Sequence, residues 1–555
     1  MDKVNTLGAG IALAVTFGLL SSLCAVAFVL APDATLDFFS AFMHGLDLKS
    51  VKSAVPLSLG RVLYGIVGLS IVGFIAALCL LGRTTSSTGN SGHRNARSPN
   101  MPGSDMLPVL RAFLDRVVRK GTLEVETASG SRFVVGDGSG ECVAVRLADS
   151  GAVWQLILRP ELALGELYMD GRIVVTQGSV CNLLMLLGYN LGSQSPPGIA
   201  RACGWRGVAL RRLHQRNTAR RATRNAAHHY NLDGRLYSLF LDPDMQYSCA
   251  YFDHPGRSLE EAQLAKKRHI AAKLLVEPGH RVLDIGSGWG GLAFYLAERC
   301  GAEVTGITLS EAQLAASTAR SCTREFSEHA EFRLQDYRAV SGRFDRIVSV
   351  GMFEHVGISY YDAFFTKVAE LLADDGVMLL HSIGRSDGPS PANPWITKYI
   401  FPGGHIPALS EVLPAIERAG LIVTDIEILR LHYTETLKAW RERFLAKSDD
   451  AKALYDDRFC RMWEFYLASA ECGFRHGGLM VFQVQLAKRL ETLPLTRDYI
   501  GTREATLRAK EAWVPMNRRQ MSGRSTVGAA AFLTHNSSCP RRLAEPELPR
   551  CPLLV

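Results

Sequence analysis

Hydrophobic and polar positions follow three patterns along the chain. Residues 4–32 and 62–82 are two uncharged, largely apolar stretches, each long enough to cross a bilayer core of about 30 Å as a helix. Residues 121–160 alternate apolar and polar positions between glycine-containing turns, which predicts short strands. From about residue 227, apolar runs of strand length alternate with segments of helix length. The chain therefore combines an apolar N-terminal part with two different folded parts.

These patterns predict six segments. They are two transmembrane helices within 1–82, a flexible linker rich in Ser, Gly, Asn and Pro at 83–104, a small β-rich module expected to bind lipid at 105–190, an Arg-rich linker helix at 191–226, a large α/β domain at 227–500 and a C-terminal tail at 501–555.

The α/β domain repeats the order strand, turn, helix. The segments "HRVLDIGSGWGGLAFYLAE" and "AEVTGITLSEAQLAAST" both follow it, and "FDRIVSVGMFEHV" and "DGVMLLHSIG" are later strands. Alternating β and α units predict a doubly wound, Rossmann-like parallel sheet. Ligands of such sheets bind at the carboxyl ends of the strands. The residues that follow each strand are therefore the ones that should carry chemistry.

The uncharged N-terminal stretches predict a helical membrane hairpin, and a signal peptide is the alternative for the first of them. Arg83, Arg94, Arg97 and Arg111 follow the second stretch. The positive-inside rule then predicts a membrane protein whose folded domains face the cytoplasm. Three basic residues in the short connecting loop oppose this orientation.

The net charge and the cysteine content indicate which partners and which redox environment to expect. The formal net charge is +8, which favours contact with an anionic surface. No acidic residue lies between Asp170 and Asp233, whereas nine arginines do. This run is either a solvated helix face or a patch for phospholipid headgroups. The twelve cysteines include no CxxC and no His/Cys cluster, so we expect reduced thiols, no disulfide scaffold and no metal site.

The glycine-rich stretch "VLDIGSGWGG" at 282–291 follows a predicted strand and opens a helix. Glycines there let the backbone pass close to a ligand, although dinucleotide-binding folds use a similar loop. Asp284 lies two residues before the first glycine, the spacing is G-x-G-x-G-G, and the next strand ends in "GITLS" without an acid for a ribose. These features favour S-adenosylmethionine over NAD, and a methyltransferase over a dehydrogenase.

The chain resembles the cyclopropane-fatty-acyl-phospholipid synthase family, which includes the mycolic-acid cyclopropane synthases. The resemblance covers roughly residues 105–490 and rests on "HHYNLDGRLYSLFLDPDMQYSCAYF", "VLDIGSGWGGLA", "GITLSEAQ", "LQDY", "DRIVSVGMFEHVG", "LLHSIG", "YIFPGGHIP" and "HYTETLKAW", in family order. It implies a class I methyltransferase domain that uses S-adenosylmethionine on unsaturated acyl chains of membrane phospholipids. It implies no nucleic-acid partner and leaves a homodimer open. The two apolar N-terminal stretches lie outside it.

The resemblance also implies two groups of site residues. The cofactor-binding positions are Tyr247, Ser248, Gly286, Gly288, Thr308, Leu309, Gln313, Gln335, Asp336 and Val350. The positions that hold a bicarbonate ion in the family are Cys249, Glu354, His381, Ile383 and Tyr433. Two positions depart from the family: Ser287 stands where many relatives have Cys, and Ala470 where relatives often have Cys, the nearest thiol here being Cys472.

These residue types suit the implied chemistry. Methyl transfer onto a double bond leaves a carbocation, and ring closure then needs a base to remove a proton from the new methyl group. A side-chain carboxylate could itself be alkylated, so a small exchangeable base such as bicarbonate is safer. Glu354 would accept a hydrogen bond from its OH, and His381 and Tyr433 would donate to its oxygens. Cys249 and Ile383 would contribute backbone N–H groups.

Structural explanations stand beside these roles. Glu354 could cap the following helix, and His381, Tyr433 and Cys249 could be ordinary core residues. The aromatic residues Tyr251, Phe353 and Phe401 could face the cation or simply fill the core. For the whole chain, the alternatives are a C-methyltransferase that makes methyl-branched chains, a catalytically silent membrane scaffold, and a nucleic-acid methyltransferase favoured by net charge alone.

Overall fold

The computed structural model describes residues 107–192, 234–322 and 327–512, together with Thr16, Leu19, Ser21, Ser22 and Thr35. The predicted membrane hairpin, the linker, nearly all of the Arg-rich helix and the end of the tail lie outside these residues. Among the residues described, no helix is both long and apolar enough to cross a bilayer. The chain forms two compact units, Met1–Met101 and Pro102–Val555, and every strand of the described part lies in the second.

A seven-stranded sheet of order β10-β11-β9-β8-β5-β6-β7 forms the large domain. The strands are β5 (Arg281–Ile285), β6 (Glu303–Thr308), β7 (Ala330–Leu334), β8 (Phe344–Val350), β9 (Leu372–Arg385), β10 (Ile422–Ile428) and β11 (Leu479–Ala487). The five from β5 to β9 pair in parallel, and β11 runs antiparallel between β9 and β10. The predicted doubly wound sheet is confirmed, with the antiparallel β11 as the addition.

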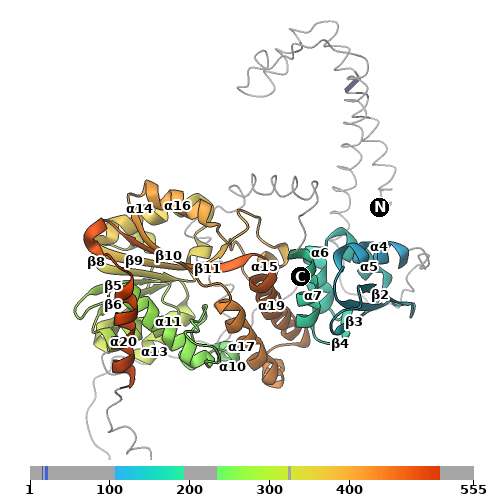
Figure 1. The fold of residues 1–555 in the computed structure, drawn as a ribbon, viewed down its shortest axis with the longest axis horizontal. Coiled ribbons are helices and arrows are strands. Elements are labelled where there is room, and N and C mark those ends of the chain that lie inside the picture. Colours follow the sequence, from blue (N-terminus) through green and yellow to red (C-terminus); the bar gives the residue numbers. More distant parts are fainter. Residues whose placement is uncertain are drawn as a thin grey trace, which may run out of the picture. The chain divides into compact units, whose positions relative to one another are not determined.

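Helices cover both faces of this sheet (Figure 1). On one face lie α11 (Leu259–Lys273), α12 (Gly291–Cys300) and α20 (Asp498–Ala512), and on the other α14 (Tyr361–Leu371) and α16 (Leu409–Arg418). The remaining helices of the described part are α10 (Gly234–Phe240), α13 (Glu311–Ser321), α15 (Pro394–Tyr399), α17 (His432–Ala446), α18 (Ser448–Leu454) and α19 (Asp457–His476), with short 3-10 turns between elements.

The continuous apolar runs of the central strands follow from this double cover. Successive side chains of a strand point to opposite faces. In β5, Val282 joins the core on the side of α11, and Leu283 joins the core on the side of α14. In β8, Ile347 and Val348 divide in the same way. Because both faces are buried, both positions must be apolar.

A smaller module precedes the large domain. Its four-stranded sheet has the order β2-β1-β3-β4, with β1 (Thr122–Glu126), β2 (Arg132–Gly136), β3 (Cys142–Leu147) and β4 (Ile173–Gln177). Four helices pack with it: α4 (Leu107–Val117), α5 (Ser150–Leu158), α6 (Pro160–Met169) and α7 (Val180–Gly192). The expectation of a mostly β module is therefore wrong. Asp149 shows why, because its carboxylate accepts from Ala152 N–H at 3.0 Å and starts a helix where the apolar pattern suggested a strand.

Two predicted boundaries move. The module was expected to end at residue 190, but α7 runs to Gly192. The tail was expected from residue 501, but α20 spans Asp498–Ala512 and its Glu511 accepts a 2.6 Å hydrogen bond from the Tyr295 hydroxyl on α12. The folded domain therefore includes this last helix.

The module packs on the large domain through α6 and α7. The Tyr168 hydroxyl donates to Glu464 at 2.8 Å, and the Arg461 guanidinium donates to the Met169 carbonyl at 2.7 Å, both partners lying on α19. Gly165 of α6 lies against the ring of Trp395 on α15, where an added Cβ would come within 2.4 Å of Nε1. The close approach of these helices depends on the missing side chain.

We therefore expect Gly165→Ala to lower the melting temperature of the protein. A helical Gly→Ala change normally stabilises by up to about 1 kcal/mol, but here the new methyl group overlaps Trp395. The matched control is Gly501→Ala in α20, where an added Cβ meets no atom within 4 Å, and which should leave the melting temperature unchanged or raise it. Equal melting temperatures for the two variants would contradict this account of the interface.

Candidate active site

The glycine-rich loop lies between β5 and α12, at the carboxyl edge of the sheet. Gly286 has φ +87°, and an added Cβ would come within 2.8 Å of the Met352 Cβ. Gly290, at φ +83°, is the N-cap of α12. Both the left-handed backbone and the close contact exclude side chains. The loop thus opens a space at the N-terminus of α12.

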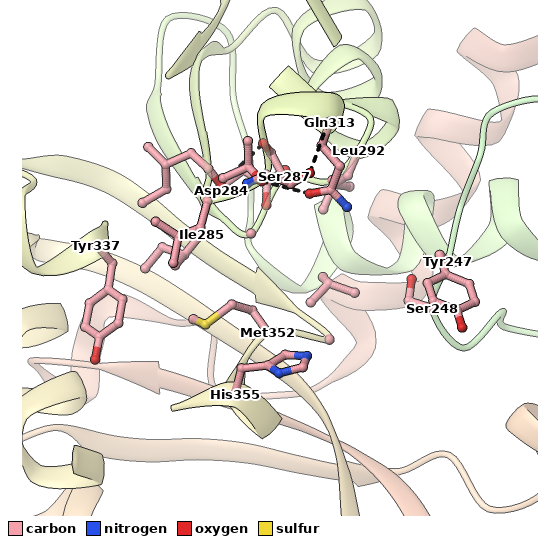
Figure 2. Close-up of a pocket in the computed structure, with 18 of the residues that line it drawn as sticks. Tyr247, Ser248, Asp284, Ile285, Ser287, Leu292, Gln313, Tyr337, Met352 and His355 are labelled. Atoms are coloured by element: carbon pink, nitrogen blue, oxygen red, sulfur yellow. Dashed lines mark hydrogen bonds between the residues drawn. The ribbon is translucent and has the colours of Figure 1, made fainter. Parts of the chain in front are cut away.

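That space is a cavity of about 160 Å³. Figure 2 shows Asp284, Ser287 and Gln313 on one side of it, and Met352 and His355 facing them. All ten predicted cofactor-binding residues line it: Tyr247, Ser248, Gly286, Gly288, Thr308, Leu309, Gln313, Gln335, Asp336 and Val350. They come from the segment before α11, from the ends of β5, β6, β7 and β8 and, for Gln313, from α13, so the fold brings together positions far apart in the sequence.

Hydrogen bonds within the chain fix several of these side chains. The Thr308 hydroxyl donates to the Gln313 side chain at 2.8 Å. The Lys266 ammonium donates to the Ser248 hydroxyl at 2.7 Å. The Asp336 carboxylate pairs with the Arg338 guanidinium at 2.6 Å. The cavity walls are therefore set by contacts inside the protein.

Asp284 tests whether this cavity suits S-adenosylmethionine. Its side chain is buried at the end of β5, and Oδ2 has no hydrogen-bond partner among the described residues. Burial raises the pKa of this carboxyl to about 7, partly opposed by the charge of Lys266. A buried acceptor without a partner is costly unless a ligand supplies a donor. S-adenosylmethionine carries N–H and O–H donors, so the residues fit it.

A second cavity, of about 410 Å³, adjoins the first, because Tyr247, Ser248, Gly351 and His355 line both. All five predicted bicarbonate positions line this second cavity: Cys249, Glu354, His381, Ile383 and Tyr433. Many other lining residues are apolar or aromatic, including Leu164 and Leu184 of the small module. We call it the apolar cavity below.

Glu354 is held by a neighbouring strand. It lies in a 3-10 turn, Phe353–His355, just after β8, and its Oε1 accepts a 2.6 Å hydrogen bond from the Ile383 N–H on β9. The carboxylate therefore does not cap the following helix. Its Oε2 is buried without a hydrogen-bond partner among the described residues. Burial raises the pKa of Glu354 to about 7, although the Ile383 N–H opposes the shift.

His381 is buried on β9, and its Nδ1 accepts a hydrogen bond of 3.2 Å from the Gln483 amide on β11. Burial, reinforced by the charges of Lys266 and Lys273, lowers the pKa of His381 to about 3. The imidazole is therefore neutral near pH 7 and carries one N–H.

Tyr433 and Cys249 lie on the far wall of the apolar cavity. Tyr433, near the start of α17, packs its ring against Phe474 and Trp440. The Cys249 thiol donates to the Ala250 carbonyl at 3.3 Å, and burial raises its pKa. The thiol is thus neutral and engaged, which leaves the backbone of Cys249 as its polar contribution.

The three aromatic residues that could face the cation lie in different surroundings. Phe401 lines the apolar cavity. Phe353 packs in the core below the sheet against Phe364, and Tyr251 stacks on the His269 ring at 4.2 Å between centroids. Neither lines a described cavity. For these two residues the core explanation holds.

The structure shows where Ala470, one of the two positions that depart from the family, and the neighbouring Cys472 lie. Ala470 lines the apolar cavity, whereas Cys472 does not. The Cys472 thiol donates to the Leu184 carbonyl of α7 at 3.0 Å. Its contact is therefore with the small module, and it cannot take the place of a thiol at position 470.

Some lining residues were not predicted from the sequence. They are Lys266 in the first cavity, and His405 and Tyr466 in the second. His405 is 2% exposed, and its backbone N–H donates to the Glu354 carbonyl at 2.9 Å. The Tyr466 hydroxyl is 2.9 Å from that of Tyr247. Only the motif "YIFPGGHIP" gave any signal, because burial of the others depends on helix packing.

Comparison with known proteins agrees with this geometry. The sequence matches the family model described as mycolic acid cyclopropane synthetase over residues 217–484. The cyclopropane-fatty-acyl-phospholipid synthase of Escherichia coli K12 is 37% identical over 354 residues, which cover 62% of this chain and 88% of that protein. The chain belongs to the cyclopropane-fatty-acyl-phospholipid synthase family. As a member of this family it is an S-adenosylmethionine-dependent methyltransferase.

Other relatives of this synthase family differ in their named products. A probable fatty acid methyltransferase of Pseudomonas putida is 39% identical, with 52% of this chain and 75% of that protein covered. A tuberculostearic acid methyltransferase of Mycobacterium tuberculosis is 38% identical, with 50% and 66% covered. A solved cyclopropane synthase of Mycobacterium tuberculosis covers 48% of this chain and 98% of its own, at 33% identity and a TM-score of 0.46.

The N-terminal part matches a different family. A 2TM family of unknown function covers residues 5–81, which coincide with the predicted membrane hairpin. This match supports association of the synthase with a membrane. It carries no information on orientation.

We expect the Glu354→Gln variant to be more stable than the wild type at pH 8. The folded-state pKa of about 7 lies above the ordinary glutamate value of 4.5, so the folded protein holds this proton more tightly than the unfolded chain does. The resulting stability is complete below pH 4.5 and is lost as the pH rises through 7. Glutamine keeps an acceptor for Ile383 N–H and has no charge to bury. The gain should reach about 3 kcal/mol.

Denaturant unfolding of both proteins between pH 5 and 8 measures this difference. The gain should shrink towards pH 5. Glu491→Gln is the control, because this side chain is 74% exposed and loses little hydration on folding. A Glu354→Gln variant that is less stable than the wild type at pH 8 would show that the carboxylate is not buried without compensation.

Proposed function

We propose that the protein transfers a methylene group from S-adenosylmethionine to the cis double bond of unsaturated phospholipid acyl chains, with bound bicarbonate as the base. The observation that carries the proposal is Glu354. Its Oε2 is an unpartnered acceptor inside an apolar cavity that shares a wall with the cofactor cavity. An acyl chain fits the apolar walls, and an anion with an OH donor fits the carboxylate.

The apolar cavity favours a lipid over a nucleic acid. Its lining includes Leu437, Phe465, Phe474 and Val481, which bind methylene groups and exclude water. Water must stay out because it would add to a carbocation. Nucleic-acid binding would instead need basic and base-reading groups at the cavity.

The chain's own residues would divide the chemistry as follows. When bound, S-adenosylmethionine would supply an electrophilic methyl group to the double bond and leave as S-adenosylhomocysteine, and bicarbonate would supply a base for the proton that ring closure releases. Glu354 would orient the anion by accepting from its OH, while neutral His381 and Tyr433 donate to its oxygens. Cys249 and Ile383 line the same cavity.

Ile383 has a limited part in this scheme. Its N–H already donates to Glu354 Oε1 at 2.6 Å, so this bond fixes the carboxylate. The residue therefore acts on the anion through Glu354. The proposal differs here from the expectation of a direct backbone contact.

The small module would deliver the substrate. Pro160, Glu161, Leu164 and Leu184 of the module form part of the apolar cavity wall. A lipid held by this module could extend an acyl chain into the cavity. The N-terminal hairpin would keep the enzyme at the membrane with these domains on the cytoplasmic side.

The second candidate is a C-methyltransferase that leaves a methyl branch. It uses the same carbocation and differs only in how the cation is resolved. The named relatives from Pseudomonas putida and Mycobacterium tuberculosis favour it. Analysis of the lipid product distinguishes the two candidate functions.

The test is expression of the full chain in a bacterial host that lacks cyclopropane lipids, followed by fatty-acid analysis. We expect wild type to add CH2 units that resist hydrogenation and show ring-methylene proton signals. Glu354→Gln should reduce the product at least about 100-fold, the scale of a lost acid–base group. The variant should still fold.

Glu464→Gln is the matched control. Glu464 is also a largely buried glutamate, but it accepts from Tyr168 and does not line the apolar cavity. It should retain product formation. Methyl-branched chains from wild type would select the second candidate. Unmodified lipids, together with no binding of S-adenosylmethionine in calorimetry, would instead support a catalytically silent membrane scaffold.

A further inference from the structure

A chain of buried polar side chains leads from the apolar cavity to α20. It begins at His381 on β9, continues through Gln483 on β11 and Lys273 on α11, and reaches Glu427 on β10. His269 then joins Glu427 at 2.8 Å to Glu504 of α20 at 2.6 Å. Lys273 and Gln483 are fully buried. Such a chain is costly in a core unless every member is satisfied, so its order of donors and acceptors is informative.

The orientation of the Gln483 amide follows from Lys273. An ammonium group has three donors and no acceptor. Lys273 Nζ lies 3.0 Å from Asp425 Oδ2 and 2.6 Å from Glu427 Oε2, and these carboxylates stabilise its charge. Its remaining contact, at 3.2 Å, must therefore be with the carbonyl oxygen of Gln483. The amide NH2 then points the other way.

The other end of the amide meets His381. The Gln483 NH2 is 3.2 Å from His381 Nδ1, and NH2 can only donate. Nδ1 must then be the unprotonated nitrogen of the neutral ring. The single ring proton is left on Nε2, and the same ring lines the apolar cavity.

We propose that Gln483 and Lys273 are positioning residues that fix His381 as the Nε2–H tautomer, so that it presents a donor to an anion in the apolar cavity. This inference rests on the proposed function for the identity of the anion. The tautomer itself depends only on the order of donors and acceptors. Without the amide, the ring would be free to place an acceptor nitrogen towards the anion, which would repel it.

The decisive variant is Gln483→Glu. A carboxylate accepts only, so it would hold the proton of His381 on Nδ1 and turn Nε2 into an acceptor. Its new charge lies beside Lys273, which favours a folded protein. We expect methylated-lipid formation to fall about 100-fold, the loss typical of one preorganised donor, with S-adenosylmethionine binding retained.

Gln485→Glu is the matched control. Gln485 is two residues along β11, equally buried, and its amide donates to the Lys273 carbonyl and to the Tyr499 hydroxyl at 2.7 Å. The same change there adds the same charge to the same region without touching His381. It should lower the melting temperature but leave the His381 tautomer and the activity per folded molecule unchanged.

Nitrogen NMR of the full chain labelled with 15N-histidine reads the tautomer directly, because Nε2–H and Nδ1–H rings have different shifts. The His381→Gln variant assigns the signal among the 15 histidines. Wild type should show Nε2–H, and Gln483→Glu should show Nδ1–H. An Nδ1–H ring in wild type overturns the inference, even if Gln483→Glu does not fold.

Activity and tautomer separate the two proposals. A switched tautomer with unchanged activity would overturn the positioning role. Equal losses of activity per folded molecule in Gln483→Glu and Gln485→Glu would also overturn it. A wild type that shows Nε2–H but transfers no methyl group would overturn the proposed function instead, and would leave the assigned tautomer standing.

Discussion

The hydrogen bond between the Ile383 N–H and Glu354 is the contact on which the arrangement of the site depends. It joins the segment after β8 to β9 and fixes a carboxylate inside an apolar cavity. Burying such a group costs free energy unless it is hydrogen-bonded. One oxygen of Glu354 is satisfied by the backbone, and the other is left for a ligand. The edge of the sheet thus holds Glu354 in place and leaves one of its oxygens without a hydrogen bond from the described residues.

Two cavities meet at this edge because of the parallel sheet. Parallel strands all end on the same side, so β5, β6, β7 and β8 deliver their following residues to one cavity. The longer β9 places His381 opposite Val350, the last residue of β8, and Ile383 two residues farther along, and both line the second cavity. The antiparallel β11 lies beside β9 and brings Gln483 to His381. The two cavities therefore adjoin, and a methyl donor in the first would lie next to an acyl chain in the second.

A set of buried polar and charged side chains extends from the second cavity to the last helix. Lys273, Glu427, His269 and Glu504 form a continuous set of ion pairs and hydrogen bonds that ends on α20. Breaking one member of such a set leaves a buried charge uncompensated. The last helix is therefore connected to His381 in the wall of the apolar cavity, although it lies past the boundary expected for the domain.

The sequence pattern alone predicted the doubly wound sheet, because apolar runs of strand length alternate with segments of helix length. The family resemblance supplied the fifteen residues of the two predicted groups, and all of them line the two cavities. The sequence also determined the apolar character of the N-terminal stretches. It did not reveal α5 of the small module, where the alternation of apolar and polar positions suggested a strand. Nor did it reveal Lys266, His405 or the amide of Gln483. These depend on which helix or strand packs against which, and only the tertiary structure decides that, because burial and hydrogen-bond direction are properties of neighbours distant in sequence.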